Sequence, residues 1–294
     1  MQALGKVLTA MVTPFTPDLR VDYDRAAALA VRLLAAGNDG LVVVGTTGES
    51  PTLSDEEKLT LFRVVKEAVG AAPVIAGTGS NNHEHTVHLS QQAAETGVDA
   101  LLVVGPYYSK PSQEGFFQHF SRVAAAVDLP IVLYNVPGRT GSNISDATTL
   151  RLAEAASNLV GIKEASGDLT QIAKICAGAP EGFTVWSGDD GLTLPILSVG
   201  GYGIISVVGH VAGREMKQMV EAFQAGNVAE AAKIHQRLLP LFKAAFLASG
   251  NPACIKRALQ IAGFDCGGVR LPLVEASACD TEEITAACAA LGFA

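Results

Sequence analysis

The amino-acid sequence predicts an α/β protein, a (β/α)8 TIM barrel with a C-terminal helical appendage. Three observations favour this fold class. Short, apolar, β-branched runs recur eight times, each is followed by a segment of helical periodicity, and no change in composition divides the alternation. Near-continuous hydrophobicity is typical of parallel strands that are covered on both faces. Eight strand–helix alternations favour one closed barrel over two open sheets.

The expected strands and helices have recognisable boundaries. Ser54, with Glu57 three residues later, has the spacing of a capping box, and Ser112 and Ser145 precede further helical patterns. The eight expected strands begin at Val7, Gly40, Pro73, Ala100, Pro130, Leu159, Phe183 and Tyr202.

The last part of the chain has a different rhythm, with helical patterns alone and no flexible linker before them. These patterns cover residues 228–248, 252–262 and 281–291. We therefore expect two regions. Residues 1–226 should form the barrel with the active site, and residues 227–294 should form a helical region packed on the barrel.

Composition limits the classes of function. The net charge of −8 is spread along the 294 residues without a Lys/Arg cluster, so nucleic acid is not an expected partner. The chain has no long uncharged apolar run and no signal-peptide pattern, which predicts a cytoplasmic protein without a membrane span. Five cysteines without C-x-x-C spacing indicate reduced structural thiols rather than disulfides or a zinc site.

Lys163 is the strongest candidate for chemistry. Strand alternation places Gly161, Lys163 and Ala165 on one face, and Val160, Ile162 and Glu164 on the other. If the small-residue face looks into the barrel, the lysine loses hydration and its neutral amine can attack a ketone to form an imine. The alternative is a lysine at a strand end that reaches water or pairs with Glu164 or Asp168.

Other polar residues follow the expected strands where a barrel builds its active site. Tyr134 ends strand five, next to the strand of Lys163, where its phenol could move protons during imine formation. Arg139 follows the same strand and suits bidentate binding of a carboxylate. Thr46 and Thr47, in the segment GTTGES, offer hydroxyls and amides to a carboxylate. The alternatives without a catalytic role are an ordinary buried aromatic for Tyr134, a surface arginine for Arg139 and a glycine-rich turn for GTTGES.

Two further patterns carry less weight. The segment HEHTVH from His83 lacks H-E-x-x-H spacing and opens a helix after strand three, which indicates a solvated face rather than a metal site. Gly200, Gly201 and Gly203 precede strand eight and do not form a dinucleotide-binding G-x-G-x-x-G motif. Neither a metal nor a nucleotide cofactor is expected.

Taken together, these motifs resemble the dihydrodipicolinate synthase and N-acetylneuraminate lyase superfamily of class I aldolase-type barrels. The resemblance covers nearly the whole chain, with the motifs in the order and spacing of the superfamily. They are TAMVTPF, GTTGES, PYYSKPSQEG, LYNVPGRTG, GIKEASGD, SGDD and GIISV. The segment YNVPGRTG is similar to the synthase branch, because the sialic acid lyases depart from this pattern at the arginine.

The resemblance implies a reaction and a set of catalytic residues. Pyruvate would form an imine on Lys163, and the derived enamine would attack L-aspartate 4-semialdehyde in the diaminopimelate route to lysine. Tyr134 would be the general acid and base, with Thr46 and Tyr108 as its proton-relay partners. No metal or organic cofactor would be required.

The resemblance also implies the binding residues and the assembly. Thr47 would hold the pyruvate carboxylate and Arg139 the semialdehyde, while Gly188 and Ile205 would line the pocket with backbone groups. Tyr108 is similar to a tyrosine that family members insert into the neighbouring subunit, which implies a homotetramer made of dimers.

Feedback regulation by lysine is expected to be weak or absent. Family members under strong control bind lysine at the dimer interface with a histidine after GTTGES and a glutamate after strand three. Lys58 and His85 stand at the matching positions, although Ser50, Asn81 and Tyr107 fit the pattern. A cation at Lys58 would repel the ammonium groups of lysine.

Two other functions remain open from the sequence. A related pyruvate-dependent lyase for a 2-keto-3-deoxy sugar acid would retain Lys163 and Tyr134 but would need hydroxyl-binding residues in place of Arg139. A catalytically silent barrel that senses a keto acid is the other alternative. Retention of Lys163, Tyr134 and Thr46 argues against the sensor.

Overall fold

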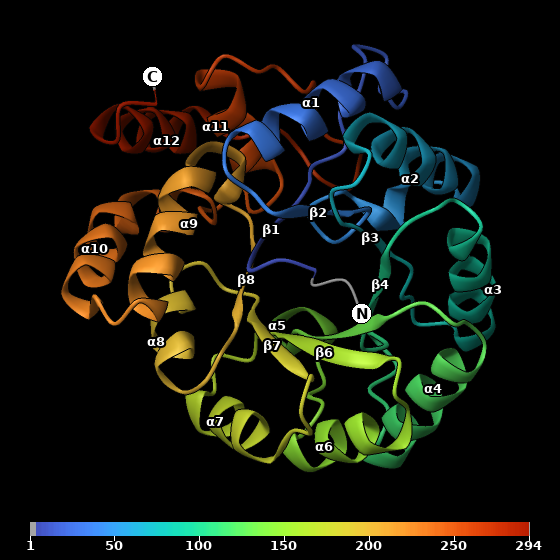
Figure 1. Cartoon of the computed structure of the whole chain (residues 1–294). Coiled ribbons are helices and arrows are strands. Elements are labelled where there is room, and N and C mark those ends of the chain that lie inside the picture. Colours follow the sequence, from blue (N-terminus) through green and yellow to red (C-terminus); the bar gives the residue numbers. More distant parts are fainter. Residues whose placement is uncertain (1–3, 294) are drawn as a thin grey trace.

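The computed structural model describes residues 4–293 and shows eight parallel strands closed into a barrel in sequence order (Figure 1). Strand β1 pairs with both β2 and β8, which closes the barrel. The predicted (β/α)8 fold is confirmed, and each strand lies within its predicted run. The strands are β1 (Val7–Ala10), β2 (Gly40–Val43), β3 (Val74–Gly77), β4 (Ala100–Val104), β5 (Ile131–Asn135), β6 (Leu159–Glu164), β7 (Thr184–Ser187) and β8 (Gly203–Ser206).

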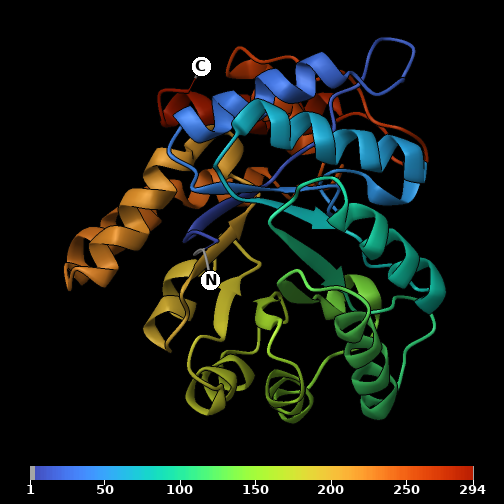
Figure 2. The same ribbon diagram turned by 45° about the vertical axis from the view of Figure 1, so that its right-hand side comes forward.

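Helices surround the barrel on its outside (Figures 1 and 2). The barrel helices are α1 (Tyr23–Ala35), α2 (Asp55–Val69), α3 (His83–Ala94), α4 (Gln113–Ala125), α5 (Pro137–Thr140), α6 (Asp146–Ala155), α7 (Leu169–Gly178), α8 (Thr193–Ser198) and α9 (Gly209–Gln224). Helix α2 begins as predicted, because the Ser54 hydroxyl accepts from the Glu57 amide at 3.2 Å and the Glu57 carboxylate accepts from the Ser54 amide at 2.9 Å. Ser112 and Ser145 likewise cap α4 and α6.

The C-terminal helices differ slightly from the predicted ranges. They are α10 (Val228–Ala244), α11 (Ala253–Ile261) and α12 (Ala278–Ala290). Helix α12 begins three residues before the predicted start at Thr281, because the Ser277 hydroxyl accepts from the Asp280 amide at 3.0 Å and caps the helix there. Helix α12 packs against α11, which lies beside α1 (Figure 1), and Arg32 of α1 donates to the Ala262 carbonyl at 2.8 Å.

The core has two layers, as expected for a barrel within a ring of helices. One layer fills the barrel interior, with Leu8, Val42, Ile75 and Trp186 among its buried members. The second lies between the strands and the helices and includes Leu41, for example. Each strand therefore places alternate side chains in the two layers.

Strand β6 departs from simple alternation, and the predicted placement of Val160 is wrong. The register with β5 shifts, so that Ile131 pairs with Leu159 but Val132 pairs with Gly161. Val160 therefore packs with the interior cluster instead of the outer one. From Gly161 onward the prediction is correct, since Lys163 pairs with the inward-facing Tyr134 and Trp186.

The cysteines differ in burial, and the described helices differ from membrane spans in length and composition. The five cysteines are free; Cys254, Cys266 and Cys288 are buried, whereas Cys279 is exposed and has no structural role in the core. The prediction of a structural thiol is therefore wrong for Cys279, which lies in the first turn of α12. None of the helices within residues 4–293 has the length and apolar composition to cross a bilayer.

Candidate active site

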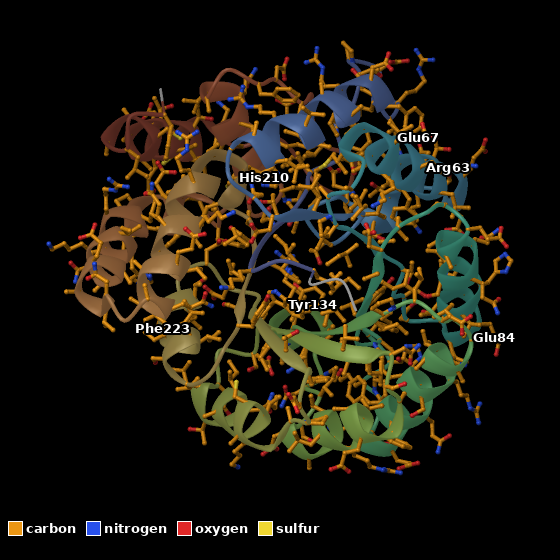
Figure 3. The ribbon with its side chains drawn as sticks, in the orientation of Figure 1. Arg63, Glu67, Glu84, Tyr134, His210 and Phe223 are labelled. Atoms are coloured by element: carbon orange, nitrogen blue, oxygen red, sulfur yellow. The ribbon has the colours of Figure 1, made fainter. Side chains whose placement is uncertain are left out.

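A cavity of about 220 Å³ opens at the carboxyl ends of strands β2 to β5. Tyr134 forms part of its wall and lies near the middle of the barrel in Figure 3. This is the end of a (β/α)8 barrel at which catalytic residues gather. The lining residues are Val44, Gly45, Thr46, Ser50, Pro51, Gly77, Gly79, Leu102, Val104, Tyr107, Tyr134, Val136, Arg139 and Thr140.

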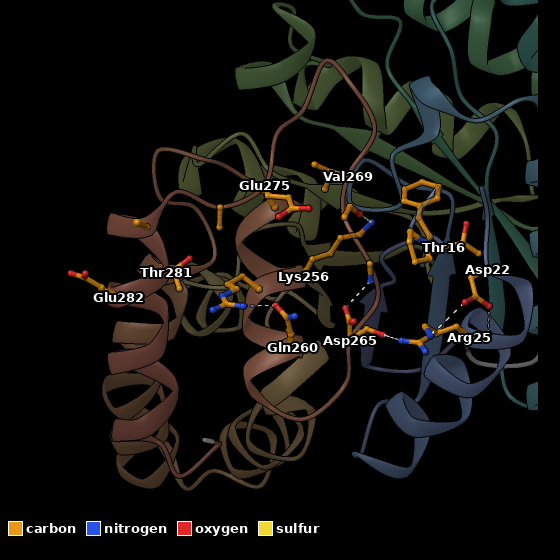
Figure 4. A pocket seen from close by; sticks show the side chains of 18 residues that line it. Thr16, Asp22, Arg25, Lys256, Gln260, Asp265, Val269, Glu275, Thr281 and Glu282 are labelled. Atoms are coloured by element: carbon orange, nitrogen blue, oxygen red, sulfur yellow. Dashed lines mark hydrogen bonds and ion pairs between the residues drawn. The ribbon is translucent and has the colours of Figure 1, made fainter. Parts of the chain in front are cut away.

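A larger cavity, of about 780 Å³, lies away from the barrel mouth between α1 and the C-terminal helices (Figure 4). Its basic residues already have partners: Arg25 donates to the Asp265 carbonyl, and Lys256 donates to the Gly268 carbonyl at 2.6 Å. Size alone therefore does not identify the site of chemistry. The smaller cavity contains the tyrosine that contacts the candidate nucleophile, so we assign the site there.

Lys163 is buried at the centre of the barrel beside Tyr134. Its side chain is almost inaccessible, and its Nζ lies 4.3 Å from the centre of the Tyr134 ring. No ion pair between described residues includes Lys163. Glu164 lies on the opposite face, and Asp168 instead caps α7 by accepting from the Thr170 and Gln171 amides. Neither alternative that the sequence left open, exposure to water or an ion pair with a neighbour, is found.

On the helix-facing side of β5 and β6, the buried carboxylate of Glu164 holds the two strands through hydrogen bonds. Burial raises the pKa of the Glu164 carboxyl, although hydrogen bonds from Gln171, Ser166 and Asn135 oppose this effect. The donors lie 2.9 Å away for Gln171 and Ser166 and 3.0 Å away for Asn135. Asn135 and Glu164 directly follow Tyr134 and Lys163, so this network fixes the two strand ends that carry the candidate catalytic pair.

The structure brings Gly188 next to Lys163. A Cβ atom on Gly188 would lie 3.1 Å from the Lys163 Cε and 2.7 Å from the Ala165 Cβ, so a side chain there would displace the lysine. Ile205 is fully buried in the interior cluster. Neither residue lines the 220 Å³ cavity, which extends from Tyr134 towards β2, β3 and β4.

The loop after β2 brings Thr46 to the cavity wall and buries Thr47. Val44 and Glu49, at its two ends, have φ angles of 61° and 60°. A β-branched residue such as valine rarely adopts this conformation, so surrounding contacts must hold the loop. Gly77 leaves room for this loop conformation, because a Cβ atom at position 77 would lie 2.3 Å from the Val44 carbonyl oxygen.

Arg139 and the two tyrosines come from neighbouring loops. Arg139 lies on the single-turn helix α5 at the cavity wall, and no ion pair between described residues involves it. Tyr107 also lines the cavity, but Tyr108 does not; it is 87% exposed with φ of 71°. Within its own chain, the predicted relay tyrosine is therefore exposed and does not line the cavity that contains Tyr134.

The C-terminal region supports the loop after β2, which was not foreseen from the sequence. Lys256 of α11 forms a buried ion pair with Glu49 at 2.8 Å. Arg270 donates its backbone amide to Glu49 at 2.9 Å and its guanidinium to Glu57 at 2.6 Å. Asn251 donates to the Thr47 hydroxyl at 2.9 Å. The loop that carries Thr46 and Thr47 is thus held from residues more than 200 positions away.

The histidines of the segment HEHTVH are distributed along α3 and engage different partners. His83 contacts His119 with 3.1 Å between their Nδ1 atoms, and His85 bonds to Asp55 at 2.8 Å. Within residues 4–293, no group of three or more His, Cys, Asp or Glu side chains is arranged to hold a metal ion.

The sequence pattern of the Dihydrodipicolinate synthetase family matches residues 3–291. The chain belongs to this family. It is 59% identical over 278 residues to the 4-hydroxy-tetrahydrodipicolinate synthase of Symbiobacterium thermophilum, with 94% of each chain covered.

Solved structures of the dihydrodipicolinate synthetase family agree with this match. The DHDPS from Cyanidioschyzon merolae with lysine bound has a TM-score of 0.97 and 45% identity, and 99% of each chain is covered. The chloride-inhibited dihydrodipicolinate synthase from Acinetobacter baumannii, complexed with pyruvate, has a TM-score of 0.95 and 35% identity over 99% of this chain and 100% of that one. The predicted class, a Schiff-base-forming synthase of this family rather than a sugar-acid lyase, is confirmed.

Proposed function

We propose that this protein condenses pyruvate with L-aspartate 4-semialdehyde through an imine on Lys163 and releases 4-hydroxy-tetrahydrodipicolinate. The observation that carries the proposal is a buried lysine that has no carboxylate partner among residues 4–293 and lies 4.3 Å from the ring centre of Tyr134. The chain is 59% identical to a relative named for this synthase activity. Incubation with pyruvate and candidate aldehydes, followed by mass spectrometry of the product, tests it. A product formed only from a sugar-derived aldehyde would contradict the proposal.

In the proposed mechanism, the neutral Lys163 amine attacks the keto carbon of pyruvate, and the carbinolamine loses water to give the imine. Tyr134 supplies and removes protons in these steps, with Thr46 and Tyr108 as relay groups. Loss of a methyl proton gives an enamine, which attacks the aldehyde carbon of the semialdehyde. The amine of the second substrate then displaces Lys163, closing the ring and freeing the enzyme.

The binding roles proposed for the remaining residues are those that the family resemblance implies. Thr47 holds the pyruvate carboxylate, while Gly188 and Ile205 enclose the imine with backbone groups. Arg139 receives the carboxylate of the semialdehyde at the cavity wall. The lysine itself is the electron sink, so these steps need neither a metal nor an organic cofactor. The reaction belongs to the cytoplasmic diaminopimelate route to lysine, and residues 1–226 carry the site while 227–294 support it.

Arg139→Ala should impair use of the semialdehyde far more than imine formation with pyruvate. Loss of a charge-assisted contact to a carboxylate costs about 1.5–3 kcal/mol, so kcat/KM for the semialdehyde should fall about 10- to 150-fold. Steady-state rates and borohydride trapping of the pyruvate imine measure the two effects separately. Arg151→Ala is the matched control, because Arg151 is exposed on α6 and pairs with Glu114. Equal damage to both steps would make Arg139 structural.

The assembly should be a homotetramer in which Tyr108 completes the site of a neighbouring subunit. Its 87% exposure and its absence from the lining of the cavity in its own chain support this proposal. Tyr108→Phe should lower turnover by about tenfold or more while pyruvate binding changes little, as expected for a proton-transfer group. Analytical ultracentrifugation and initial rates measure assembly and turnover. A fully active monomer would contradict the role of Tyr108.

Lysine should inhibit this enzyme weakly or not at all. Lys58 is buried and pairs with Asp55 at 3.1 Å, while His85 bonds to the same carboxylate at 2.8 Å. Burial raises the pKa of Asp55, but the bonds from His85 and Lys58 outweigh it and lower the pKa overall. The carboxylate is therefore ionised but already bound by His85 and Lys58, so it is not free to pair with an ammonium group of lysine, which would also have to approach the Lys58 cation.

A lysine titration of the initial rate measures this prediction directly. The double variant Lys58→His with His85→Glu should gain inhibition, because it removes the cation and supplies a carboxylate. Strong inhibition of the unaltered protein at sub-millimolar lysine would show that this interpretation of Lys58 and His85 is wrong.

A further inference from the structure

The segment between α10 and α11 contacts the loop after β2 through the side chain of Asn251. Asn251 is 7% exposed, and its Nδ2 donates to the Thr47 Oγ1 at 2.9 Å. Thr47 is itself 2% exposed. The two residues are 204 positions apart, so this contact exists only because the C-terminal helices pack against the barrel.

With the Asn251 Nδ2 facing Thr47, and the Asn251 Oδ1 buried without a hydrogen-bond partner among the described residues, the direction of this hydrogen bond determines where the threonine proton can point. A hydroxyl has one proton and two lone pairs, and an amide nitrogen can only donate. Because Asn251 occupies a lone pair of the Thr47 oxygen, the hydroxyl proton must point elsewhere. No acceptor for that proton is found among residues 4–293, which leaves it available to a bound carboxylate.

Asn251 is held in place independently of Thr47. The amide of Ser249 donates to the Asp280 carboxylate at 2.7 Å, and the Ser249 hydroxyl donates to the same oxygen. The Cys254 amide donates to the Gly250 carbonyl at 3.0 Å as α11 begins. These bonds tie the segment to α11 and α12, so the amide of Asn251 approaches Thr47 from a fixed support.

The loop that contains Thr47 is also restrained on its other side. Glu49 pairs with Lys256 at 2.8 Å, and Lys256 lies in α11, the helix that directly follows the segment of Asn251. The backbone of the loop and the hydroxyl of Thr47 are therefore both controlled by one C-terminal segment.

We propose that Asn251 is a positioning residue for pyruvate, which directs the Thr47 hydroxyl proton towards the carboxylate of the keto acid. This inference rests on the proposed role of Thr47 in holding that carboxylate. Asn251 acts through Thr47 and takes no part in proton transfer at Lys163. Its loss should therefore raise the KM for pyruvate while the KM for the semialdehyde stays nearly constant.

Two substitutions of Asn251 separate orientation from mere packing. Asn251→Ala removes the donor and should raise the KM for pyruvate severalfold. Asn251→Asp keeps the shape but replaces the donor with an anionic acceptor, so Thr47 should donate to it instead of to pyruvate. This variant should raise the KM for pyruvate by about tenfold or more. Should Asn251→Asp fail to fold, Asn251→Ala alone and combined with Thr47→Val still tests the orientation of the hydroxyl.

A double-mutant cycle tests whether the effect passes through the hydroxyl. In a Thr47→Val background, which keeps the volume of the side chain, Asn251→Ala should add less than about a twofold change in the KM for pyruvate. Asn158→Ala is the matched control, since this half-buried asparagine lies directly before β6, away from Thr47, and donates to the Ala124 and Val127 carbonyls at 3.0 and 2.9 Å. It should lower thermal stability but leave the KM for pyruvate within about twofold.

The outcomes distinguish this inference from the proposed function. An unchanged KM for pyruvate in Thr47→Val would overturn the role of Thr47 in binding the carboxylate. If Thr47→Val raises that KM but the Asn251 variants leave it unchanged, or if the two effects are simply additive, the positioning role of Asn251 is wrong. A rise in Asn251→Asp that exceeds that in Asn251→Ala and disappears without the Thr47 hydroxyl supports it.

Discussion

Lys163→Met should leave a folded protein whose turnover is lower by about a thousandfold or more. Methionine keeps an unbranched side chain of similar length but has no amine, so no imine can form. Lys163 is buried and has no ion-pair partner among the described residues, so its removal leaves no uncompensated carboxylate. Initial rates with both substrates measure the loss of turnover, and circular dichroism checks the fold.

A matched lysine variant shows that this loss belongs to the site. Lys174→Met lies on α7, where the lysine is 63% exposed and pairs with Asp146. Its turnover should equal that of the unaltered protein. Retention of more than about a tenth of the turnover in Lys163→Met would mean that the reaction proceeds without this amine.

Lys256→Met should destabilise the protein by about 3–5 kcal/mol, because it strands a buried carboxylate. Glu49 is 1% exposed and pairs with Lys256 at 2.8 Å, in the loop that also carries Thr46 and Thr47. Burial lowers the pKa of Lys256, and the nearby Glu49 carboxylate acts against this effect. Urea unfolding at pH 7 and constant protein concentration measures the free energy of unfolding.

The paired change separates the lost interaction from lost packing. Adding Glu49→Gln to Lys256→Met removes the stranded charge and should recover part of the free energy of unfolding. A single variant as stable as the unaltered protein would show that this ion pair does not support the loop. No recovery in the double variant would assign the effect to packing of the lysine stem.

The fold was predictable because each strand has an apolar sequence pattern that can be recognised without knowledge of the rest of the chain. Eight apolar runs alternate with helical patterns, and the capping box at Ser54 predicts the exact residue at which α2 begins. The barrel face on which Val160 lies was not predictable. It depends on the irregular pairing of β5 with β6 at Val132 and Gly161, and the sequence of neither strand alone shows this irregularity. The start of α12 was missed by three residues, although Ser277 is an ordinary capping residue.

The candidate site was predictable where neighbouring strands define it. Tyr134 and Lys163 end adjacent strands, and the register pairs them directly. The support of Thr47 by Asn251 and of Glu49 by Lys256 was not predictable, because neither pair shares a local pattern or a sequence neighbourhood. The sequence predicts only a lysine-binding position for Tyr107, yet Tyr107 lines the cavity of its own chain.

Borohydride reduction in the presence of pyruvate, followed by peptide mapping, tests the central claim most directly. The proposed imine predicts one reduced adduct, on the peptide that contains Lys163, and no adduct when pyruvate is omitted. Lys163→Met should give no adduct under the same conditions. An adduct on Lys256 or on any other lysine, or none on Lys163 while the enzyme turns over, would contradict covalent catalysis at Lys163.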